Sequence, residues 1–388
     1  MPLATAPRIL VVNAGSSSLK LRLLDPGDRI VASADLPAPA GQADDAAVSQ
    51  AVRAFGEVDA VGHRIVHGGT RFSAPVRVDA EVTGALVALT DLAPLHQPKS
   101  LAALTAVGAL LPDVPAVACF DTAFHAGMPA AATTYALPRE WRTRWQLRRY
   151  GFHGLSHAYA SRKAAELVGR NITELRIVTC HLGAGASLAA VHRGRSVDTT
   201  MGFTPLEGLV MATRSGNVDP GLVLWLEEHV GMPPAEIAAT LEHRSGLLGL
   251  AGTADMRAVL DRAHGGDADA GLAVDVYSHR LRAGIAAMAA AMEGLDVLVF
   301  TGGVGENAPE IRERACAGLA FLDVGLDPAV NSATGDAEIG ATGARVTVVV
   351  VTAREDLQIA HEVRQVLGLA RPQRNRSGPG SCPTAPRS

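Results

Sequence analysis

The chain has 388 residues, of which 35 are basic and 39 acidic, giving a formal net charge of -4, and 48% of its residues are hydrophobic. This near balance of charge argues against a protein that binds nucleic acid through a strongly basic surface. At about 100–200 residues per domain, the length predicts two or three domains.

Further features narrow the class of protein. The sequence has no run of 18 uninterrupted apolar residues, so we expect no membrane-spanning helix. Residues 1–15 lack the basic and long apolar segments of a signal peptide, so we expect a cytoplasmic protein. The four cysteines show no CxxC spacing, which argues against a zinc ribbon or a disulfide framework. Lysine is scarce, and the three lysines are Lys20, Lys99 and Lys163.

The N-terminal segment combines two apolar runs with a polar turn. Ile9–Val12 form a short apolar run that ends in Asn13, Gly15 and three serines, and leucines alternate with basic residues over 19–23. This pattern predicts a strand, a polar turn and a second strand. A second copy of the pattern occurs at 177–191, which indicates a duplicated fold.

Helical and apolar patterns alternate along the rest of the chain. We expect helices at 98–110, 156–168, 277–292, 310–318 and 357–367. We expect buried strands at 117–120, 296–300 and 345–351. Strands that alternate with helices predict an α/β fold built of layers. The tail 371–388 is rich in proline, glycine, serine and arginine, and we expect it to be disordered.

Three glycine-rich turns follow predicted strands. NAGSSSLK (13–20) offers small residues, backbone amides and hydroxyls that can surround phosphate oxygens. TGGVGEN (301–307) is expected as a loop between a strand and a helix, where α/β proteins often hold a nucleotide, and HLGAGAS (181–187) is a third turn. Each segment alone can be an ordinary structural turn, but together they favour a phosphorylated ligand.

Two arginines lie in unusual surroundings. Arg64 lies between His63 and His67, just before a glycine pair, and Arg214 precedes a Ser/Gly turn. A guanidinium can bind carboxylate or phosphate through two parallel hydrogen bonds. In a chain so rich in arginine, the residue pattern alone favours a surface or structural cation for each of them.

The acidic residues and histidines leave further alternatives open. Asp121 and Glu355 each follow a predicted strand, where a carboxylate can hold Mg²⁺ or a basic side chain, or else cap a helix. His153 and His157 are four residues apart, but an expected helix N-cap at Ser156 lies between them and no third ligand accompanies them. A zinc site is therefore the weakest interpretation.

Together these motifs resemble those of the acetate kinases, the acetokinase family of the actin-like ATPase fold. The resemblance rests on LVVNAGSSSLK (10–20), VGHRIVHGG (61–69), LAPLH (92–96), FDTAFH (120–125), YGFHGLSH (150–157), CHLGAGAS (180–187), DTTMGFTPLEGLVMATRSGNVDPG (198–221), SGLLGLAG (245–252) and FTGGVGEN (300–307). It covers the chain from about Ile9 to Leu367, and the block at 198–221 is highly specific.

The resemblance implies a fold and a domain organisation. Two actin-like ATPase (ribonuclease H-like) lobes are expected, in a duplicated βββαβαβα arrangement. Residues 1–123 with the closing helix 357–370 would form the N-terminal lobe, and residues 124–356 would form the second, nucleotide-binding lobe. A homodimer is also expected from the resemblance.

The resemblance also implies an activity. Members of the family transfer a phosphoryl group reversibly and in line between ATP and acetate, giving acetyl phosphate and ADP, with Mg²⁺ or with Mn²⁺ in its place. The carboxylate acceptor is already ionised at neutral pH, so catalysis needs positioning and charge stabilisation and no general base. We thus expect a phosphotransferase with a carboxyl group as acceptor, whose partners are acetate and ATP.

Residue roles follow from matching the motifs. The expected catalytic residues are Arg64, Asp121, His153, His181 and Arg214. The nucleotide is expected to contact Asn13, Ser16, Ser18, Lys20, His181, Gly183, Gly185, Asp255, Arg257, Gly302, Gly303, Gly305 and Asn307. Acetate is expected to contact Arg64, Val66, Leu95, Phe152 and Pro205, and the metal to contact Asn13 and Glu355.

Two other functions fit the same motifs. A propionate or other short-chain acyl kinase would differ in its substrate by methylenes that are each worth only ~1–3 kcal/mol in an apolar pocket. The other alternative is a catalytically inactive nucleotide-binding module, and its best support is Ala184, where the family usually has asparagine. Arg64, Asp121, His181 and Arg214 argue against such a module.

Overall fold

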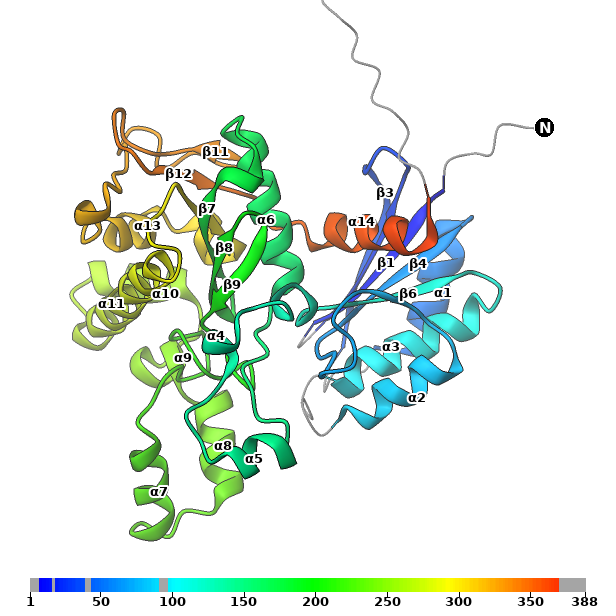
Figure 1. Ribbon diagram of the computed structural model, residues 1–388, viewed down its shortest axis with the longest axis horizontal. Coiled ribbons are helices and arrows are strands. Elements are labelled where there is room, and N and C mark those ends of the chain that lie inside the picture. The colour runs from blue at the N-terminus through cyan, green and yellow to red at the C-terminus, as the bar shows by residue number, and fades with distance from the viewer. Residues whose placement is uncertain (1–6, 16–17, 39–42, 91–96, 370–388) are drawn as a thin grey trace, which may run out of the picture.

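The computed structural model describes residues 7–15, 18–38, 43–90 and 97–369, and within these ranges the chain forms two α/β lobes, each built on a six-stranded sheet (Figure 1). The first sheet contains β1 (Ile9–Ala14), β2 (Ser18–Leu24), β3 (Ile30–Pro37), β4 (Ala60–Ile65), β5 (Val76–Arg77) and β6 (Ala116–Phe120). The second sheet contains β7 (Arg176–Leu182), β8 (Ala186–His192), β9 (Arg195–Thr199), β10 (Val297–Thr301), β11 (Ala337–Glu338) and β12 (Thr347–Val350).

Helices cover the sheets and connect the lobes. Those nearest the N-terminus are α1 (Asp45–Phe55), α2 (Ala80–Ala88) and α3 (Gln97–Leu110). The middle of the chain forms α4 (Ala130–Thr133), α5 (Arg139–Arg144), α6 (Gly154–Leu167), α7 (Pro220–Glu228), α8 (Pro234–His243), α9 (Gly246–Ala251), α10 (Met256–His264) and α11 (Ala268–Ala290). The last helices are α12 (Gly302–Asn307), α13 (Pro309–Cys316) and α14 (Glu355–Leu367). None of the helices within the described residues is both long and apolar enough to cross a bilayer.

The two sheets repeat one topology. Their strand orders are β3-β2-β1-β4-β6-β5 and β9-β8-β7-β10-β12-β11. In each sheet the first three strands are antiparallel, the next two run parallel to the first, and a short antiparallel strand closes the edge. The prediction of two α/β lobes in a duplicated arrangement is therefore confirmed.

Alternation along β1 shows why both faces of the first sheet are covered. Ile9 and Val11 belong to a core shared with α14, whereas Leu10 and Val12 pack with α1 and α3 on the opposite face. Successive side chains of a strand point to opposite faces, so a continuous apolar run needs a helix layer on each side.

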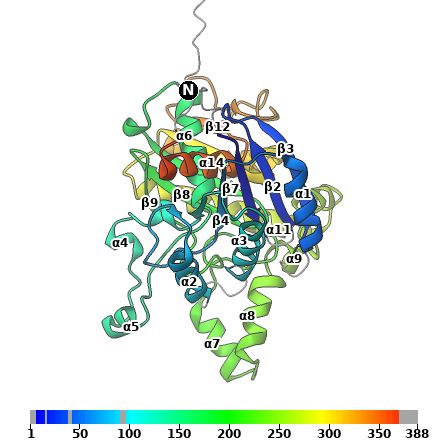
Figure 2. The same cartoon turned by 90° about the vertical axis from the view of Figure 1, so that its right-hand side faces the viewer.

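Each lobe receives a helix from the other. α6 follows β6 of the first sheet, yet its Ala160 and Ala164 pack with Ile177 and Val299 of the second sheet. α14 follows β12 of the second sheet, yet its Ile359 packs with the core of the first sheet (Figures 1 and 2). The lobes are thus joined by two crossing helices as well as by the chain itself.

The structure corrects several local predictions. The segment 301–307 was expected as a loop, but Gly302–Asn307 form α12. The helix expected at 277–292 begins at Ala268, after an Asp267 side chain that accepts hydrogen bonds from the first-turn amides. The turn expected at 181–187 shrinks to 183–185, because β7 and β8 extend into it. The disordered tail expected at 371–388, like Ser16 and Leu95, lies outside the described residues.

Candidate active site

A cavity of about 600 Å³ lies between the lobes, where the parallel strands of both sheets end. Asn13 and Arg64 lie near the ends of β1 and β4, and Asp121 follows β6. In the second lobe His181 lies near the end of β7, and Glu355 follows β12. The carboxyl ends of parallel strands are the usual ligand-binding edge of α/β sheets, and here two such edges face each other.

The cavity wall is rich in positive charge. Its basic residues within the described part of the chain are Lys20, Arg22, Arg64, Lys99, Arg214 and Arg354. Its acidic residues there are Asp121, Glu355 and Asp356. This excess of cations suits an anionic ligand.

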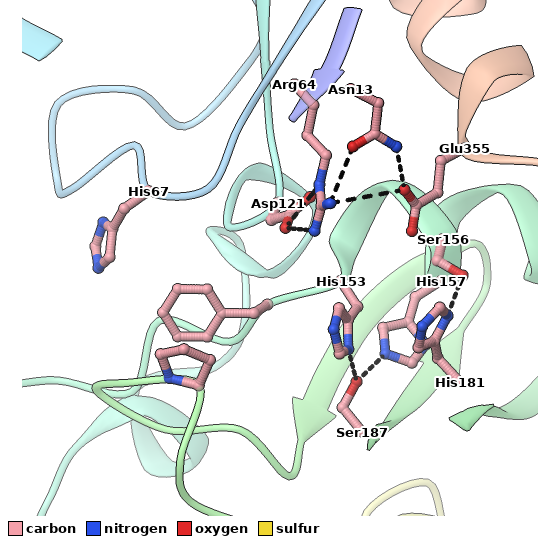
Figure 3. Close-up of polar contacts among 12 residues, drawn as sticks. Asn13, Arg64, His67, Asp121, His153, Ser156, His157, His181, Ser187 and Glu355 are labelled. Atoms are coloured by element: carbon pink, nitrogen blue, oxygen red, sulfur yellow. Dashed lines mark hydrogen bonds and ion pairs between the residues drawn. The ribbon is translucent and has the colours of Figure 1, made fainter. Parts of the chain in front are cut away.

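Arg64 is the centre of a polar cluster in the first lobe (Figure 3). Its Nε lies 3.0 Å from Oδ1 of Asp121 and its Nη2 2.6 Å from Oδ2. Its Nη1 donates to Oδ1 of Asn13 at 3.1 Å, and the Asn13 amide donates to Oε2 of Glu355 at 2.9 Å. The Glu355 carboxylate lies 4.0 Å from Nη1 of Arg64. Two carboxylates therefore share one guanidinium and leave its remaining edge for a ligand.

The charge states of this cluster follow from burial and pairing. Burial acts against the charged form of Glu355, but Arg64 and His181 hold the pKa of that carboxyl below its usual value. Burial raises the pKa of Asp121, and the nearby Arg64 only partly opposes the rise. Burial alone would lower the pKa of Arg64, whereas the two carboxylates raise it. The guanidinium therefore stays charged at any ordinary pH.

The backbone around Asp121 places His153. The Gly154 amide donates to the Asp121 carbonyl at 2.9 Å, and a Cβ on Gly154 would lie only 2.2 Å from that oxygen. His153 itself has a left-handed backbone with φ of 57° and precedes the first residue of α6. The N-cap expected at Ser156 is therefore wrong, and the sequence between the two histidines is a helical turn.

The histidines are held by buried hydroxyls. Nδ1 of His153 lies 2.9 Å from Oγ of Ser187, and Nε2 of His157 lies 2.8 Å from the same oxygen. Nδ1 of His181 lies 2.7 Å from Oγ of Ser156. The rings of His153 and His181 are 4.4 Å apart between centroids, and both line the cavity (Figure 3).

All three imidazoles favour their neutral form. Burial lowers the pKa of His153 well below its usual value, and His181, Arg64 and Arg214 lower it further. Burial also lowers the pKa of His157 and of His181. Near pH 7 each ring thus carries one N–H and one lone pair.

Arg214 enters the cavity from the second lobe. Its Nε lies 3.1 Å from a carboxylate oxygen of Glu242, and its Nη1 donates to the Pro205 carbonyl at 3.1 Å. Gly185 makes room for it, because a Cβ there would lie 3.1 Å from Nε2 of His153 and 3.3 Å from Nη1 of Arg214. The glycine turn at 183–185 therefore shapes the wall of the cavity between the two side chains.

A small apolar patch adjoins the two guanidinium groups. Val66, Phe152 and Pro205 line the cavity, and Val66 and Phe152 are buried. The loop that carries Pro205 is held by Glu207, whose carboxylate accepts hydrogen bonds from Tyr135 and Arg149 at 2.5 Å each. Such a patch beside cations fits a short carboxylate with an apolar tail.

The remaining predicted nucleotide contacts divide into two groups. Ser18, Lys20, Gly302 and Gly303 line the cavity together with Asn13, Gly185 and His181. Gly183, Asp255, Arg257, Gly305 and Asn307 are not among the described residues that line it. Asp255 instead caps α10 by accepting a hydrogen bond from the Arg257 amide, and Asn307 donates to the Gly303 carbonyl at 2.9 Å.

Sequence reasoning missed several residues of the wall and its support. The scarcity of lysine was a signal for Lys99: the chain has three lysines, and two of them line the cavity. Arg354 is adjacent to Glu355 and binds Asp356 through two nitrogens. Glu242, which holds Arg214, and Arg312, which is fully buried and donates to the Gly305 and Glu306 carbonyls of α12, had no signal in the sequence.

Known proteins resemble this chain over most of its length. A sequence profile described as the Acetokinase family matches residues 44–361. The acetate kinase of Thermosipho africanus is 44% identical over 395 residues, which covers 92% of this chain and 97% of the relative. The acetate kinase of Thermotoga maritima is 48% identical over 316 residues, which covers 80% and 78% of the two chains.

Solved structures agree with these relatives. The acetate kinase of Porphyromonas gingivalis superposes with a TM-score of 0.86 at 38% identity, covering 93% of this chain and 100% of the other. A propionate kinase from Francisella tularensis also gives a TM-score of 0.86, at 35% identity and with the same coverage.

Proposed function

Because the chain belongs to the acetokinase family, we propose that its cavity catalyses reversible phosphoryl transfer between ATP and acetate, giving acetyl phosphate and ADP. The observation that carries this proposal is the pair of guanidinium groups, Arg64 and Arg214, that reach one cavity from opposite lobes beside an apolar patch. One guanidinium can bind the acetate carboxylate while the other binds the phosphoryl group in transfer.

This reaction needs no general base. The attacking oxygen belongs to a carboxylate that is ionised near pH 7, so no proton has to leave the nucleophile. Asp121 is bound to Arg64 by both oxygens and so positions a cation. The role of the arginines and of His181 is to stabilise the negative charge of the transferring group.

A divalent metal fits oxygen donors that come from both lobes. Glu355 favours its ionised form and accepts a hydrogen bond from the Asn13 amide nitrogen, while Oδ1 of Asn13 accepts one from Arg64. Carboxylate and amide oxygens are hard ligands of the kind that Mg²⁺ prefers. We propose that Glu355, with Asn13 beside it, would hold Mg²⁺ or Mn²⁺ that arrives with the nucleotide. When bound, the ion would neutralise charge on the phosphates. Among the described residues no cluster of three acidic, cysteine or histidine side chains could hold the ion alone, which is typical of a site shared with phosphates.

The nucleotide would extend from this centre along the second lobe. Gly302 and Gly303 begin α12 and line the cavity, with φ of 80° at Gly302, and a Cβ there would lie 2.8 Å from the Leu182 carbonyl. We propose that this helix start contacts the nucleotide, and that residues 1–123 with 357–370 move as one lobe relative to 124–356 when ligands bind. Asp255 and Arg257 do not line the cavity, so they would contact only a part of the nucleotide that extends beyond it.

The experiment that tests the activity traps acetyl phosphate as its hydroxamate. With ATP, Mg²⁺ and acetate the protein should form product far above a control without enzyme, and Arg64→Ala and Arg214→Ala should form almost none. Absence of product with the intact protein would favour an inactive nucleotide-binding module, for which Ala184 in the cavity wall is the supporting residue.

A second candidate substrate is propionate. It is favoured by the similarity to the propionate kinase of known structure, and the patch of Val66, Phe152 and Pro205 has no charged group that would reject one more methylene. Comparing kcat/KM for acetate, propionate and butyrate separates the two, because a preference for propionate or butyrate would overturn the assignment of acetate.

We also propose that the protein forms a homodimer through the region of α7. No residue of this helix is buried, and about half of the surface of several apolar side chains there is exposed, at Leu222, Leu224, Trp225 and Val230. Several exposed apolar side chains within one short segment favour a protein interface there. Sedimentation equilibrium should give a dimer for the intact protein and a monomer for Leu222→Glu with Trp225→Glu. Leu272→Glu, at an equally exposed apolar residue on α11, should leave the dimer intact.

A further inference from the structure

A continuous chain of hydrogen bonds leads from His153 into the interior of the second lobe. His153 Nδ1 lies 2.9 Å from Oγ of Ser187, which lies 2.8 Å from Nε2 of His157. Nδ1 of His157 lies 2.7 Å from Oγ1 of Thr179, and the Thr179 hydroxyl donates to the Ala189 carbonyl at 3.5 Å. Ser187, His157 and Thr179 are completely buried, so water cannot replace any link.

The far end of this hydrogen-bond chain favours one direction. The Thr179 hydroxyl has one proton and two neighbours, Nδ1 of His157 at 2.7 Å and the Ala189 carbonyl at 3.5 Å. A carbonyl oxygen can only accept, so both contacts become hydrogen bonds only when Thr179 donates to Ala189 and accepts from His157. Nδ1 of His157 then carries the ring proton, and its Nε2 accepts from the Ser187 hydroxyl. Ser187 in turn accepts from Nδ1 of His153, whose ring proton is thereby placed on the buried side.

The middle of the hydrogen-bond chain keeps the same order of donors and acceptors because His157 is neutral. Its ring is fully buried next to the rings of His125 and His181, at 5.7 and 6.4 Å between centroids, and among the described residues its hydrogen-bond partners are two hydroxyls. A neutral imidazole has one donor and one acceptor nitrogen, so fixing one of them fixes the other.

The cavity end favours the same arrangement. Nε2 of His153 and Nη1 of Arg214 both lie within 3.3 Å of the point where a Cβ of Gly185 would be. A guanidinium can only donate, so a lone pair on Nε2 complements it, whereas an N–H there would face a cation.

We propose that Ser187, His157 and Thr179 are positioning residues that hold His153 with its proton on Nδ1, so that Nε2 presents a lone pair to Arg214 in the cavity. His153 would thus present an acceptor on the side of the arginine and would not itself donate a hydrogen bond into the cavity. The effect on turnover rests on the function proposed above, but the position of the proton does not.

Long-range ¹H–¹⁵N spectra of the full chain with labelled histidine test the proposal directly. Signals are assigned with His153→Gln and His125→Gln. His153 should be protonated on Nδ1. His125 provides an internal reference of the opposite kind, because its Nε2 lies 3.0 Å from the Phe152 carbonyl and must be the protonated nitrogen.

Breaking the hydrogen-bond chain at its buried end should free His153 to change its tautomer. In Thr179→Val the His153 signals should shift towards protonation of Nε2, whereas Thr179→Ser should keep the spectrum of the intact protein. Thr199→Val is the matched control. Thr199 is a buried threonine of the same sheet that donates to the Leu188 carbonyl and takes no part in this hydrogen-bond chain. If Thr179→Val does not fold, Ser187→Ala breaks the same chain one link nearer the cavity and should also release the tautomer.

Turnover gives the second readout. Thr179→Val should lower kcat by at least about tenfold, since placing the proton of an active-site imidazole on the wrong nitrogen is costly, with Thr179→Ser and Thr199→Val within about twofold of the intact protein. A protonated Nε2 on His153 in the intact protein, or an unchanged His153 spectrum in both Thr179→Val and Ser187→Ala, would overturn the proposal. If the intact protein made no acetyl phosphate, the spectra would still decide the tautomer.

Discussion

Asp121 binds the Arg64 guanidinium with both carboxylate oxygens, at 3.0 Å from Nε and 2.6 Å from Nη2. The pair is almost fully enclosed, with 2% of the Asp121 side chain and 15% of the Arg64 side chain exposed. Two parallel bonds fix the plane of the guanidinium as well as its position in the cavity wall.

Asp121→Asn should remove the fixed orientation of Arg64 while keeping a side chain of the same shape. We expect kcat to fall by about 10²-fold or more, because a displacement of about 1 Å at a positioned cation costs that much. Steady-state kinetics and thermal unfolding of the purified variant measure the two effects separately.

Asp296→Asn is the matched control for this variant. Asp296 also binds an arginine, Arg176, through two nitrogens at 3.0 Å, but it lies at the start of β10, at the opposite end of the strand from the cavity. It should retain the turnover of the intact protein. Unaltered turnover in Asp121→Asn would show that Asp121 has only a structural role.

Gly185→Ala should damage the site without unfolding the protein. The new Cβ would press on the ring of His153 at 3.1 Å and on Arg214 at 3.3 Å, two side chains that face an open cavity and have room to move. We expect kcat/KM to fall by about 10²-fold. Gly183→Ala, two residues earlier in the same turn, meets only ordinary contacts at 3.4 and 3.5 Å and should change kcat/KM by less than about threefold. Equal effects of the two substitutions would remove the steric explanation.

Val66→Ala should widen the apolar patch of the cavity. The change removes two methyl groups beside Phe152 and Pro205, so a longer acyl chain gains the space that the valine occupied. We expect the ratio of kcat/KM for propionate over acetate to rise by about tenfold, the value of one methylene in an apolar pocket. Val218→Ala, on the exposed surface before α7, should leave the ratio unchanged. An unchanged ratio in Val66→Ala would place the acyl group elsewhere.

Glu362 predicts a pH dependence of stability. Burial raises its pKa to about 7 from an ordinary value of 4.5, although contacts with Gln358 and Cys119 partly oppose the rise. Between these two values the folded protein binds more protons at this residue than the unfolded chain does, so the free energy of unfolding falls as pH rises. A pKa shift of this size lowers the free energy of unfolding by as much as about 3 kcal/mol, and the full decrease is reached above pH 7.

Glu362→Gln should remove this decrease in the free energy of unfolding with rising pH. Oε2 of Glu362 and Oε1 of Gln358 are both buried and have no hydrogen-bond partner among the described residues, so an amide at 362 also offers a missing donor. Urea unfolding at several pH values should show a stability gain that grows from pH 4.5 to 7 and then stays constant. Glu313→Gln, on the exposed side of α13, should show no such trend. A gain independent of pH would exclude ionisation of Glu362 as its cause.

Much of the fold follows from patterns within short segments. The apolar run Ile9–Val12 and its copy at 177–191 predicted the two hairpins, and the hairpins predicted the duplication. Glycine, by contrast, misled the prediction at 301–307, because Gly302 and Gly303 start a helix that tertiary contacts stabilise. The fully buried Arg312 binds carbonyls at the end of that helix, a contact that no local pattern could indicate.

Site residues were predictable where one motif gives both the residue and its position at the end of a strand. Arg64, Asp121 and His181 lie at strand ends, and the register of parallel strands brings strand ends together. The partner that holds Arg214 was not predictable, because Glu242 comes from a separate segment and lies in none of the motifs. Asp255 and Arg257 show the converse, since matching a motif did not place them on the cavity wall.

The exchange of α6 and α14 between the lobes has a consequence for biosynthesis. Ile9 and Val11 lie in β1, which is synthesised long before the helix that covers them, α14, which ends at Leu367. One face of the first sheet therefore stays uncovered until α14 has been translated, and the N-terminal lobe cannot complete its folding ahead of the second. Nascent chains that stall before residue 355 should expose this apolar sheet face to chaperones and proteases.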